Sequence, residues 1–388
     1  MAGIGRRLGM SKKLSTKKIA AALSTQKLGA PAIAQHLQIS EPLVQSWLDG
    51  EGFPPPDKLL RLGALLKMPY SDLVIRDLSD APVVAFRKAR GTKTTESHYE
   101  EARAKGLLLK NLVPYIEFGD NAVRGTILNP TINYDFLVEV ARKIRTEIGV
   151  SEVDRISFDQ LITFFDSLHA VLIPVMWGSK KTHENAVHIF LPESRVTWIY
   201  LNLDVNLLDF KFWMAHELGH CLTPGLRGDE AEDFADAFAG ALLFPHQLAE
   251  AAFSAISTIS SEGSQLQAIK ELSGKNGIAP FTIYRQINAY AQHVGKKQLN
   301  LEPAIHKVSA VVNNGIKPVS ELLLGGVSMP DAAQLISIIE TNFGTQFFSV
   351  FRKYINASQA GPGIVQTILG VSGLDARNIH SELADATV

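Results

Sequence analysis

The chain has 388 residues, of which 46% are hydrophobic and 20% are charged. This balance is typical of globular domains and excludes a largely disordered chain, and the length favours two or three domains. A net charge of −1 argues against a general polyanion binder. The single cysteine, Cys221, and the lack of an apolar run approaching the ~20 residues of a membrane span predict a cytoplasmic protein without disulfides or a membrane association.

Residues 14–78 follow a basic arm and show helical periodicity throughout, with a capping residue or proline before each apolar run. Residues 1–80 hold 11 Lys and Arg against 7 Asp and Glu, a net charge of +4 in a chain that is otherwise acidic. The stretch GAPAIAQHLQISEPLVQSWLDGEGFPPPDKLLRLGALL, residues 29–66, resembles the helix-turn-helix of Cro/XRE repressors. We therefore expect residues 14–78 to form a helix-turn-helix domain.

This resemblance implies that the second helix of the pair enters the major groove of double-stranded DNA. The residues that would face base edges are Ser40, Glu41, Gln45 and Ser46. That helix has no Lys or Arg, so phosphate contacts are expected from Lys12, Lys13, Lys17, Lys18 and Lys27. A helical bundle that binds protein, or a degenerate DNA reader, is the alternative. Because one such unit rarely gives enough specificity, a homodimer is expected.

Residues 79–130 are predicted to be a linker or connecting segment because they are rich in charged and polar residues. Within them, LVPYIEFG at residues 112–119 is a possible strand. Residues 131–295 alternate between helical periodicity and short Val- and Ile-rich runs. Their order predicts two helices, a small sheet and further helices, an α+β domain at the centre of a mainly α, multidomain chain.

The run HELGH places His216 and His220 four residues apart, so that on a helix both side chains project from one face. Neutral imidazole suits Zn²⁺, and Glu217 is placed to act as the general base for a metal-activated water. The alternative is that this five-residue pattern occurs by chance and that the two histidines bind no metal. The apolar surroundings of the histidines favour a metal, because buried ionisable groups need partners.

A catalytic zinc site needs a third protein ligand, and the next predicted helix offers Glu232. Asp236 lies one turn later and is a candidate to accept the second N–H of a liganding histidine. A solvated acidic helix start would also explain such carboxylates. That explanation is weaker here, since small and apolar residues share their face of the helix.

The segments FWMAHELGHCL and EDFADAFAGALLFP resemble the ImmA/IrrE metallopeptidases, and the similarity covers about residues 134–292. Asp236 stands where the family usually has Asn, and Phe244 where it has Met. The resemblance implies a zincin-like metallopeptidase domain over residues 131–295 with one Zn²⁺ per chain. It assigns His216, His220 and Glu232 as ligands, Glu217 as base and Asp236 as a supporting residue.

Other candidate residues receive no firm role. Cys221 points away from His220 on a helix, which favours a structural cysteine over a redox switch or an extra ligand. His183, His188 and His246 are candidates to bind substrate or act as an acid, and Tyr284 is a candidate to stabilise the oxyanion, on position alone. Residues 300–388 are predicted to be a helical C-terminal region of unknown role. Four phenylalanines there are expected in the core: Phe343, Phe347, Phe348 and Phe351.

Together these features predict a DNA-binding regulatory zinc metallo-endopeptidase whose substrate is a repressor or another regulatory protein, by analogy with the family. One alternative is a transcriptional regulator whose metallopeptidase-like domain senses a ligand or partner without proteolysis. Another is a component of a toxin–antitoxin or phage-defence system.

Overall fold

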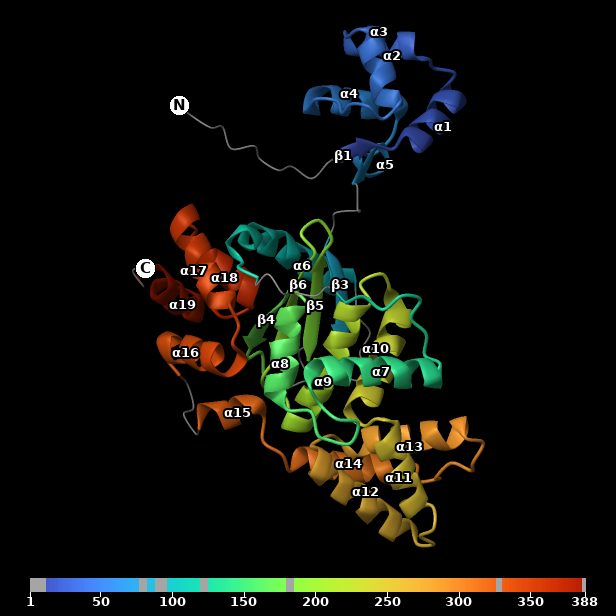
Figure 1. Cartoon of the computed structure of the whole chain (residues 1–388). Coiled ribbons are helices and arrows are strands. Elements are labelled where there is room, and N and C mark those ends of the chain that lie inside the picture. Colours follow the sequence, from blue (N-terminus) through green and yellow to red (C-terminus); the bar gives the residue numbers. More distant parts are fainter. Residues whose placement is uncertain are drawn as a thin grey trace. The chain divides into compact units, whose positions relative to one another are not determined.

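The computed structural model describes residues 12–76, 82–87, 96–118, 125–178, 185–325 and 330–385. The chain divides into two compact units, Met1–Ala81 and Pro82–Val388, each of which is described by itself. The described residues are mostly helical and include one small four-stranded mixed sheet, as the sequence predicts in outline (Figure 1). No helix in the described ranges combines the length and apolar character that a membrane span requires.

The first unit is a bundle of short helices around one apolar core that includes Trp47 and Leu62. Its helices are α1 (Thr16–Gln26), α2 (Ala30–Leu37), α3 (Glu41–Leu48), α4 (Pro56–Leu66) and α5 (Tyr70–Leu73). Prolines at the first turns of α2, α3 and α4 fit positions where a helix has no use for the backbone N–H.

The prediction of helix throughout this unit is wrong at its two ends. β1 (Lys12–Leu14) pairs antiparallel with β2 (Val74–Arg76), so a short ribbon joins the beginning of the unit to its end. The β-branched pair Val74-Ile75 favours extended backbone. The arm before Lys12 lies outside the described residues.

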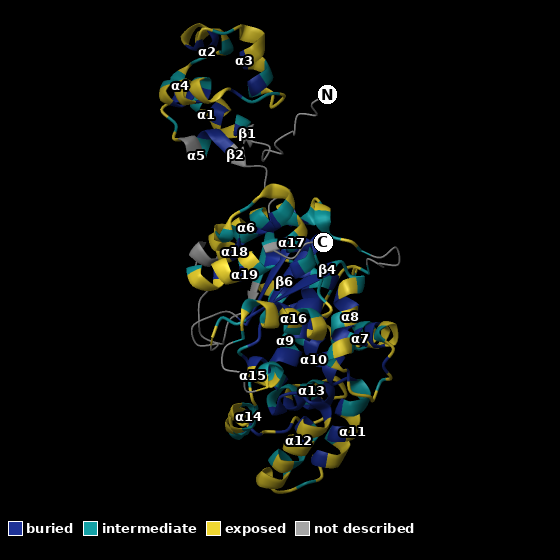
Figure 2. Ribbon diagram, turned by 90° about the vertical axis from the view of Figure 1, so that its left-hand side faces the viewer, coloured by how far each residue is buried: buried dark blue, intermediate teal, exposed yellow. Residues whose placement is uncertain are grey.

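The second unit is built on a sheet with the strand order β3-β5-β6-β4. The strands are β3 (Val83–Arg87), β4 (Ala170–Val175), β5 (Ala186–Leu191) and β6 (Val196–Asn202). β4 runs parallel to β6, whereas β5 is antiparallel to both β6 and β3. Every residue of β4 and β6 is buried, which shows that both faces of these strands are covered (Figure 2).

The helices of this unit follow in chain order. They are α6 (Glu96–Leu109), the 3-10 helix η2 (Lys110–Tyr115), α7 (Tyr134–Ile148), α8 (Phe158–Ser167), α9 (Leu207–Leu222), α10 (Gly228–Leu243), α11 (His246–Ile256), α12 (Glu262–Asn276), α13 (Pro280–His293), α14 (Ala304–Asn314), α15 (Val319–Leu324), α16 (Ala332–Phe343), α17 (Phe347–Ser358), α18 (Pro362–Leu369) and α19 (Gly373–Asp385). α8 begins with a complete capping box formed by Ser157 and Gln160, the start that the sequence predicts at Ser157.

The segment predicted to be a linker contributes structure to the second unit. β3 supplies an edge strand of the sheet, and α6 packs against β3 and β5. Pro82 is buried beside α6, where Gly106 leaves room for its ring. The possible strand at residues 112–119 is a wrong prediction, because Lys110–Tyr115 forms a 3-10 helix. Pro114 has no backbone N–H to donate to a ladder, which is the physical reason.

The C-terminal helices cover one face of the sheet rather than forming a separate body. Trp198 of β6 meets the ring of Phe347 edge-on at 6.4 Å, and the hydroxyl of Tyr200 donates to the carbonyl of Ile368 at 2.9 Å. The four phenylalanines expected in the core are all buried. That prediction is confirmed, and Figure 1 shows α17 and α18 beside the strands.

Candidate metal centre

Helices α9 and α10 carry the predicted site and cross in close contact. The side chain of Asn206 caps the start of α9 by accepting from the N–H of Asp209. One turn beyond His216, a Cβ on Gly219 would lie 2.9 Å from the Cα of Ala235 on α10. Glycine at this position therefore lets the two backbones approach and sets which residues of α10 face the histidines.

Three side chains from these helices converge. Nε2 of His216 and Nε2 of His220 lie 3.0 Å apart. The two carboxylate oxygens of Glu232 lie 3.4 Å from the His216 nitrogen and 3.3 Å from the His220 nitrogen. On the other side of its ring, Nδ1 of His216 lies 3.0 Å from the carboxylate of Asp236, which can accept its proton.

These separations fit a tetrahedral ion. Ligand bonds of about 2.0–2.1 Å at tetrahedral angles place neighbouring ligand atoms about 3.3 Å apart. The set of two histidines and one glutamate could hold a metal ion, with its ligand atoms all within 4.8 Å of one another. Because Asp236 favours the proton on Nδ1 of His216, the lone pair of Nε2 faces the cluster.

The electrostatics of the metal-free site show the same complementarity. Burial lowers the pKa of His216, but the contacts with Asp236 and Glu232 outweigh it and bring the pKa to about 9. Burial raises the pKa of Glu232, but the two histidines hold it well below its usual range. A cation is therefore favoured among these groups, and without a metal a proton supplies that charge.

Glu217 is buried beside this cluster and contacts His188, which the sequence offers only as a candidate for binding substrate or acting as an acid. Its Oε2 lies 3.4 Å from Nδ1 of His188, which is on β5. Neither atom makes a hydrogen bond of regular geometry with any described residue, although both are buried. The His188 ring is 5.4 Å from that of His220. Only the placement of β5 against α9 brings His188 here.

A cavity of about 150 Å³ opens at the cluster. His188, His220 and Glu232 line one side, and Val83, Val84 and Ala85 of the edge strand β3 line another. The loop between α9 and α10 closes it with Pro224, Leu226 and Arg227. An extended chain entering this cavity would thus pass between an edge strand and the histidines. β3 lies in the segment predicted as linker, so this wall of the cavity is not predicted from the sequence.

Of the remaining candidates, His183 lies outside the described residues. Cys221 is half-buried, and burial raises the pKa of its thiol well above the usual value. This environment suits an inert cysteine better than a redox switch. The Tyr284 hydroxyl is buried and donates to the carbonyl of Leu299, so it is engaged away from the cluster. His246 lies at the start of α11 and contacts Tyr134.

In the first unit, the predicted base-facing residues lie on the outer side of α3. Ser40, Glu41 and Gln45 are exposed, whereas Ser46 is half-buried. The Gln45 amide donates to the side chain of Asp49 at 3.0 Å.

The lysines expected to contact phosphate are less uniform. Lys17 and Lys27 are exposed, but the ammonium of Lys18 pairs with Asp72 at 2.6 Å. The backbone of Lys12 and Lys13 forms β1, and their side chains lie outside the described residues.

The second unit is thus a helix-rich domain with a small mixed sheet and a cluster of two histidines and a glutamate beside a buried glutamate. Comparisons with protein-family models, with curated proteins and with solved structures found no match for this chain.

Proposed function

We propose that this protein is a regulatory zinc metallo-endopeptidase whose first unit binds double-stranded DNA. The observation that carries the proposal is the convergence of His216, His220 and Glu232 at ligand-to-ligand distances, with Asp236 on the far nitrogen of His216. The buried carboxylate of Glu217, whose Oε2 has only the 3.4 Å contact with His188 in the part of the chain that the structure describes, supports a hydrolytic site over a purely structural one. A structural zinc site would be closed by a fourth protein ligand, and the described residues offer three.

Zinc bound by these ligands would polarise a substrate carbonyl and lower the pKa of a water molecule. Glu217 then accepts a proton from the attacking water at Oε2 and later delivers it to the leaving amine. His188 holds the Glu217 carboxylate through the 3.4 Å contact. Asp236 keeps His216 in the tautomer that presents Nε2.

The peptidase part of the proposal can be tested by separating metal binding from catalysis. We expect about one zinc per purified chain, lost in His216→Ala and kept in Glu217→Gln, because only the histidine is a ligand. Elemental analysis measures both. A wild-type chain that holds no zinc after purification in zinc-containing medium would refute the metal centre.

Proteolysis itself can be followed without knowing the substrate. Cell extract is incubated with the wild-type protein or with Glu217→Gln, and new peptide N-termini are labelled and identified by mass spectrometry. We expect neo-N-termini only with the wild type. If both proteins yielded the same neo-N-termini, the result would instead favour a regulator whose metal domain senses a ligand or partner without proteolysis. A repressor among the cleaved proteins would support the regulatory assignment.

DNA binding by the first unit is supported by the resemblance of residues 29–66 to a helix-turn-helix and by the exposed polar side chains on α3. Selection from genomic fragments should enrich a short palindrome if the protein binds as a dimer. The affinity should fall steeply with salt, because Lys17 and Lys27 would displace counterions. Glu41→Ala and Gln45→Ala should change which sequences are selected, whereas Lys17→Ala should weaken all of them. Affinity that does not depend on salt would contradict phosphate contacts.

A further inference from the structure

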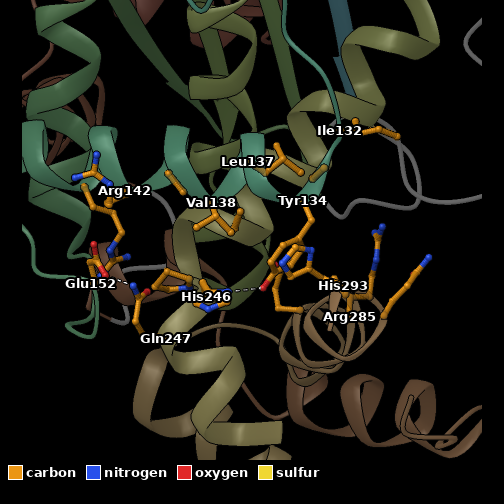
Figure 3. Close-up of a pocket in the computed structure, with 18 residues that line it drawn as sticks. Ile132, Tyr134, Leu137, Val138, Arg142, Glu152, His246, Gln247, Arg285 and His293 are labelled. Atoms are coloured by element: carbon orange, nitrogen blue, oxygen red, sulfur yellow. Dashed lines mark hydrogen bonds between the residues drawn. The ribbon is translucent and has the colours of Figure 1, made fainter. Parts of the chain in front are cut away.

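A second cavity, of about 510 Å³, lies in the second unit away from the metal centre (Figure 3). It is enclosed by α7, the end of α10, the start of α11 and α13. This volume falls within the range of about 300–1,000 Å³ in which proteins bind small organic molecules. The proposed peptidase activity does not use any of its residues.

The lining of this cavity is strongly cationic, although the chain as a whole is nearly neutral. It includes three arginines, two histidines and a single acidic residue, Glu152. That glutamate is engaged by the side-chain amide of Gln247 (Figure 3). The local charge therefore favours a negatively charged occupant.

The three arginines differ in the hydrogen bonds and ion pairs that their side chains already make. Arg145 is fully buried and donates to the backbone carbonyls of Ser151, Asp154 and Leu242, so its charge is not neutralised by direct contact with a described carboxylate. Arg142 forms a two-pronged pair with Glu139, and both side chains are about half exposed. Such a surface pair contributes little and can exchange for another anion.

Arg285 has no ion-pair partner among the described residues, and its side chain is exposed at the cavity. A planar guanidinium in this state offers two parallel N–H donors, which match the oxygens of a phosphate or carboxylate. The imidazoles of His246 and His293 line the same space. Nε2 of His293 lies 3.3 Å from the carboxylate of Asp135, whereas Nε2 of His246 is the ring nitrogen not used in the contact with Tyr134. The two guanidinium groups of Arg142 and Arg285 match the charge of a phosphate monoester better than that of one carboxylate.

The cavity also has a flat aromatic wall. The rings of Tyr134 and His293 stack with centroids 4.4 Å apart, and the Tyr134 hydroxyl is 3.1 Å from Nδ1 of His246. Figure 3 shows these three side chains together, on three different helices. Small and apolar side chains such as Leu137, Ala141 and Ala289 also line the cavity and provide an apolar surface for the body of a ligand.

This cavity is separated from the metal centre by the thickness of α10. At about 100° per residue, Ala237 and Ala241 of the cavity lie about 140–180° around the helix from Glu232. Asp236, in contrast, lies only about 40° from Glu232. An occupant of the cavity would therefore touch the back of α10 and would not be in contact with the His216–His220–Glu232 cluster.

We propose that this cavity is a binding site for a small organic anion made of a planar ring and a phosphate, of the size of a nucleoside monophosphate. The phosphate binds Arg285, with Arg142 and His246 in reach, and the ring lies along the Tyr134–His293 wall. The site is independent of zinc and of Glu217.

The test uses the full-length protein and three probes: AMP, adenosine and inorganic phosphate. Binding is measured by calorimetry and by the shift of the thermal unfolding midpoint. We expect saturable 1:1 binding of AMP at concentrations up to the millimolar range, and at least tenfold weaker binding of adenosine and of phosphate, because each lacks one half of the ligand. The same result is expected with Glu217→Gln and after chelation of zinc.

Two cavity variants and one control locate the site. Arg285→Ala should weaken AMP binding about tenfold through the loss of a charge-assisted pair. Tyr134→Leu should reduce the difference in affinity between AMP and inorganic phosphate, because the ring of AMP loses its aromatic contact. Arg377→Ala removes an exposed arginine of α19 and should leave AMP affinity unchanged. The proposal is overturned if AMP does not saturate, if phosphate binds as well as AMP, or if Arg285→Ala and Arg377→Ala behave alike.

Discussion

His216 shows how much of a site can depend on the partner of one ring nitrogen. Asp236 accepts from Nδ1, and this contact leaves Nε2 free to face His220 and Glu232. In the metal-free chain the same surroundings raise the pKa of His216 to about 9, so a metal must displace a proton. Spacing in the sequence predicts the cluster, but the choice of His216 as the partner of Asp236 comes from the fold.

Zinc affinity should depend on pH for this reason. Below the raised pKa of His216, binding releases about one proton, so the logarithm of the association constant should rise by about one per pH unit between neutral pH and about 9. Chelator competition at several pH values measures it. In Asp236→Asn the pKa of His216 should fall and the slope should flatten near neutral pH. If the zinc affinity of the wild-type protein did not change with pH over this range, the contact between Asp236 and His216 would be contradicted.

Lys211 presents a second buried charge, away from the cluster. Its ammonium contacts the carbonyl of Asn276 at 3.4 Å, and burial, reinforced by Arg155 and Arg145, lowers its pKa to about 7. The unfolded lysine titrates near 10.4, so between about 7 and 10.4 the unfolded chain holds the proton that the folded chain releases. The buried charge of Lys211 therefore destabilises the folded chain to its full extent below about pH 7, and this effect disappears as the pH rises towards about 10.4.

Lys211→Met should accordingly raise the free energy of unfolding, by roughly 2–4 kcal/mol more at pH 6.5 than at pH 10. Urea denaturation of the metal-free protein at both pH values measures this difference. The exposed Lys307 on α14 provides the control, because Lys307→Met should change stability little at either pH. If Lys211→Met raised the free energy of unfolding equally at both pH values, the pKa of Lys211 would not be lowered in the folded state.

At the scale of elements, the crossing of α9 and α10 decides whether the candidate ligands meet. HELGH and the carboxylates after it are visible in the sequence, as are the two helices. Their relative rotation depends on the contact of Gly219 with Ala235, which no periodicity reveals. The edge strand β3 is similarly hidden, because five residues within a polar segment give little pattern until β5 pairs with them.

Gly219→Ala tests this crossing. The added methyl would lie 2.9 Å from the Ala235 backbone and should cost about 1–3 kcal/mol of stability while weakening zinc binding. Gly274 of α12 is a matched control, since a Cβ there meets nothing within 4 Å. Gly274→Ala should stabilise the chain by up to about 1 kcal/mol and leave zinc binding unchanged. Thermal unfolding and chelator competition measure both effects, and zinc binding unaffected by Gly219→Ala would be the contrary result.

At the scale of the whole molecule, the C-terminal helices are part of the domain that carries the candidate site. The hydroxyl of Thr345 donates to the carbonyl of Leu172 in β4 at 2.6 Å, and Phe347 packs on Trp198. Without these helices, one face of β4 and β6 would be exposed to water. The first unit, in contrast, has its own apolar core around Trp47.

Two truncations should therefore behave differently. A chain of residues 82–388 should unfold cooperatively and bind zinc as the full chain does, because the core of the second unit is complete. A chain of residues 1–300 should lose cooperative unfolding of the second unit and aggregate, since apolar strands are uncovered. Calorimetry and zinc analysis distinguish these outcomes. A soluble, zinc-binding 1–300 chain would contradict the role assigned to the C-terminal helices.

The sequence by itself determined the features set by local spacing: the short helices of the first unit, the strands β4, β5 and β6, and the helices that carry His216, His220 and Glu232. Periodicity, capping residues and a four-residue step are enough for these, because they depend on neighbours in the chain. Only the tertiary structure decided that Asp236 contacts His216, that His188 meets Glu217, and that β3 lines the cavity. It also placed Arg285 and Tyr134 around one cavity, because contacts between distant segments depend on how helices and strands pack.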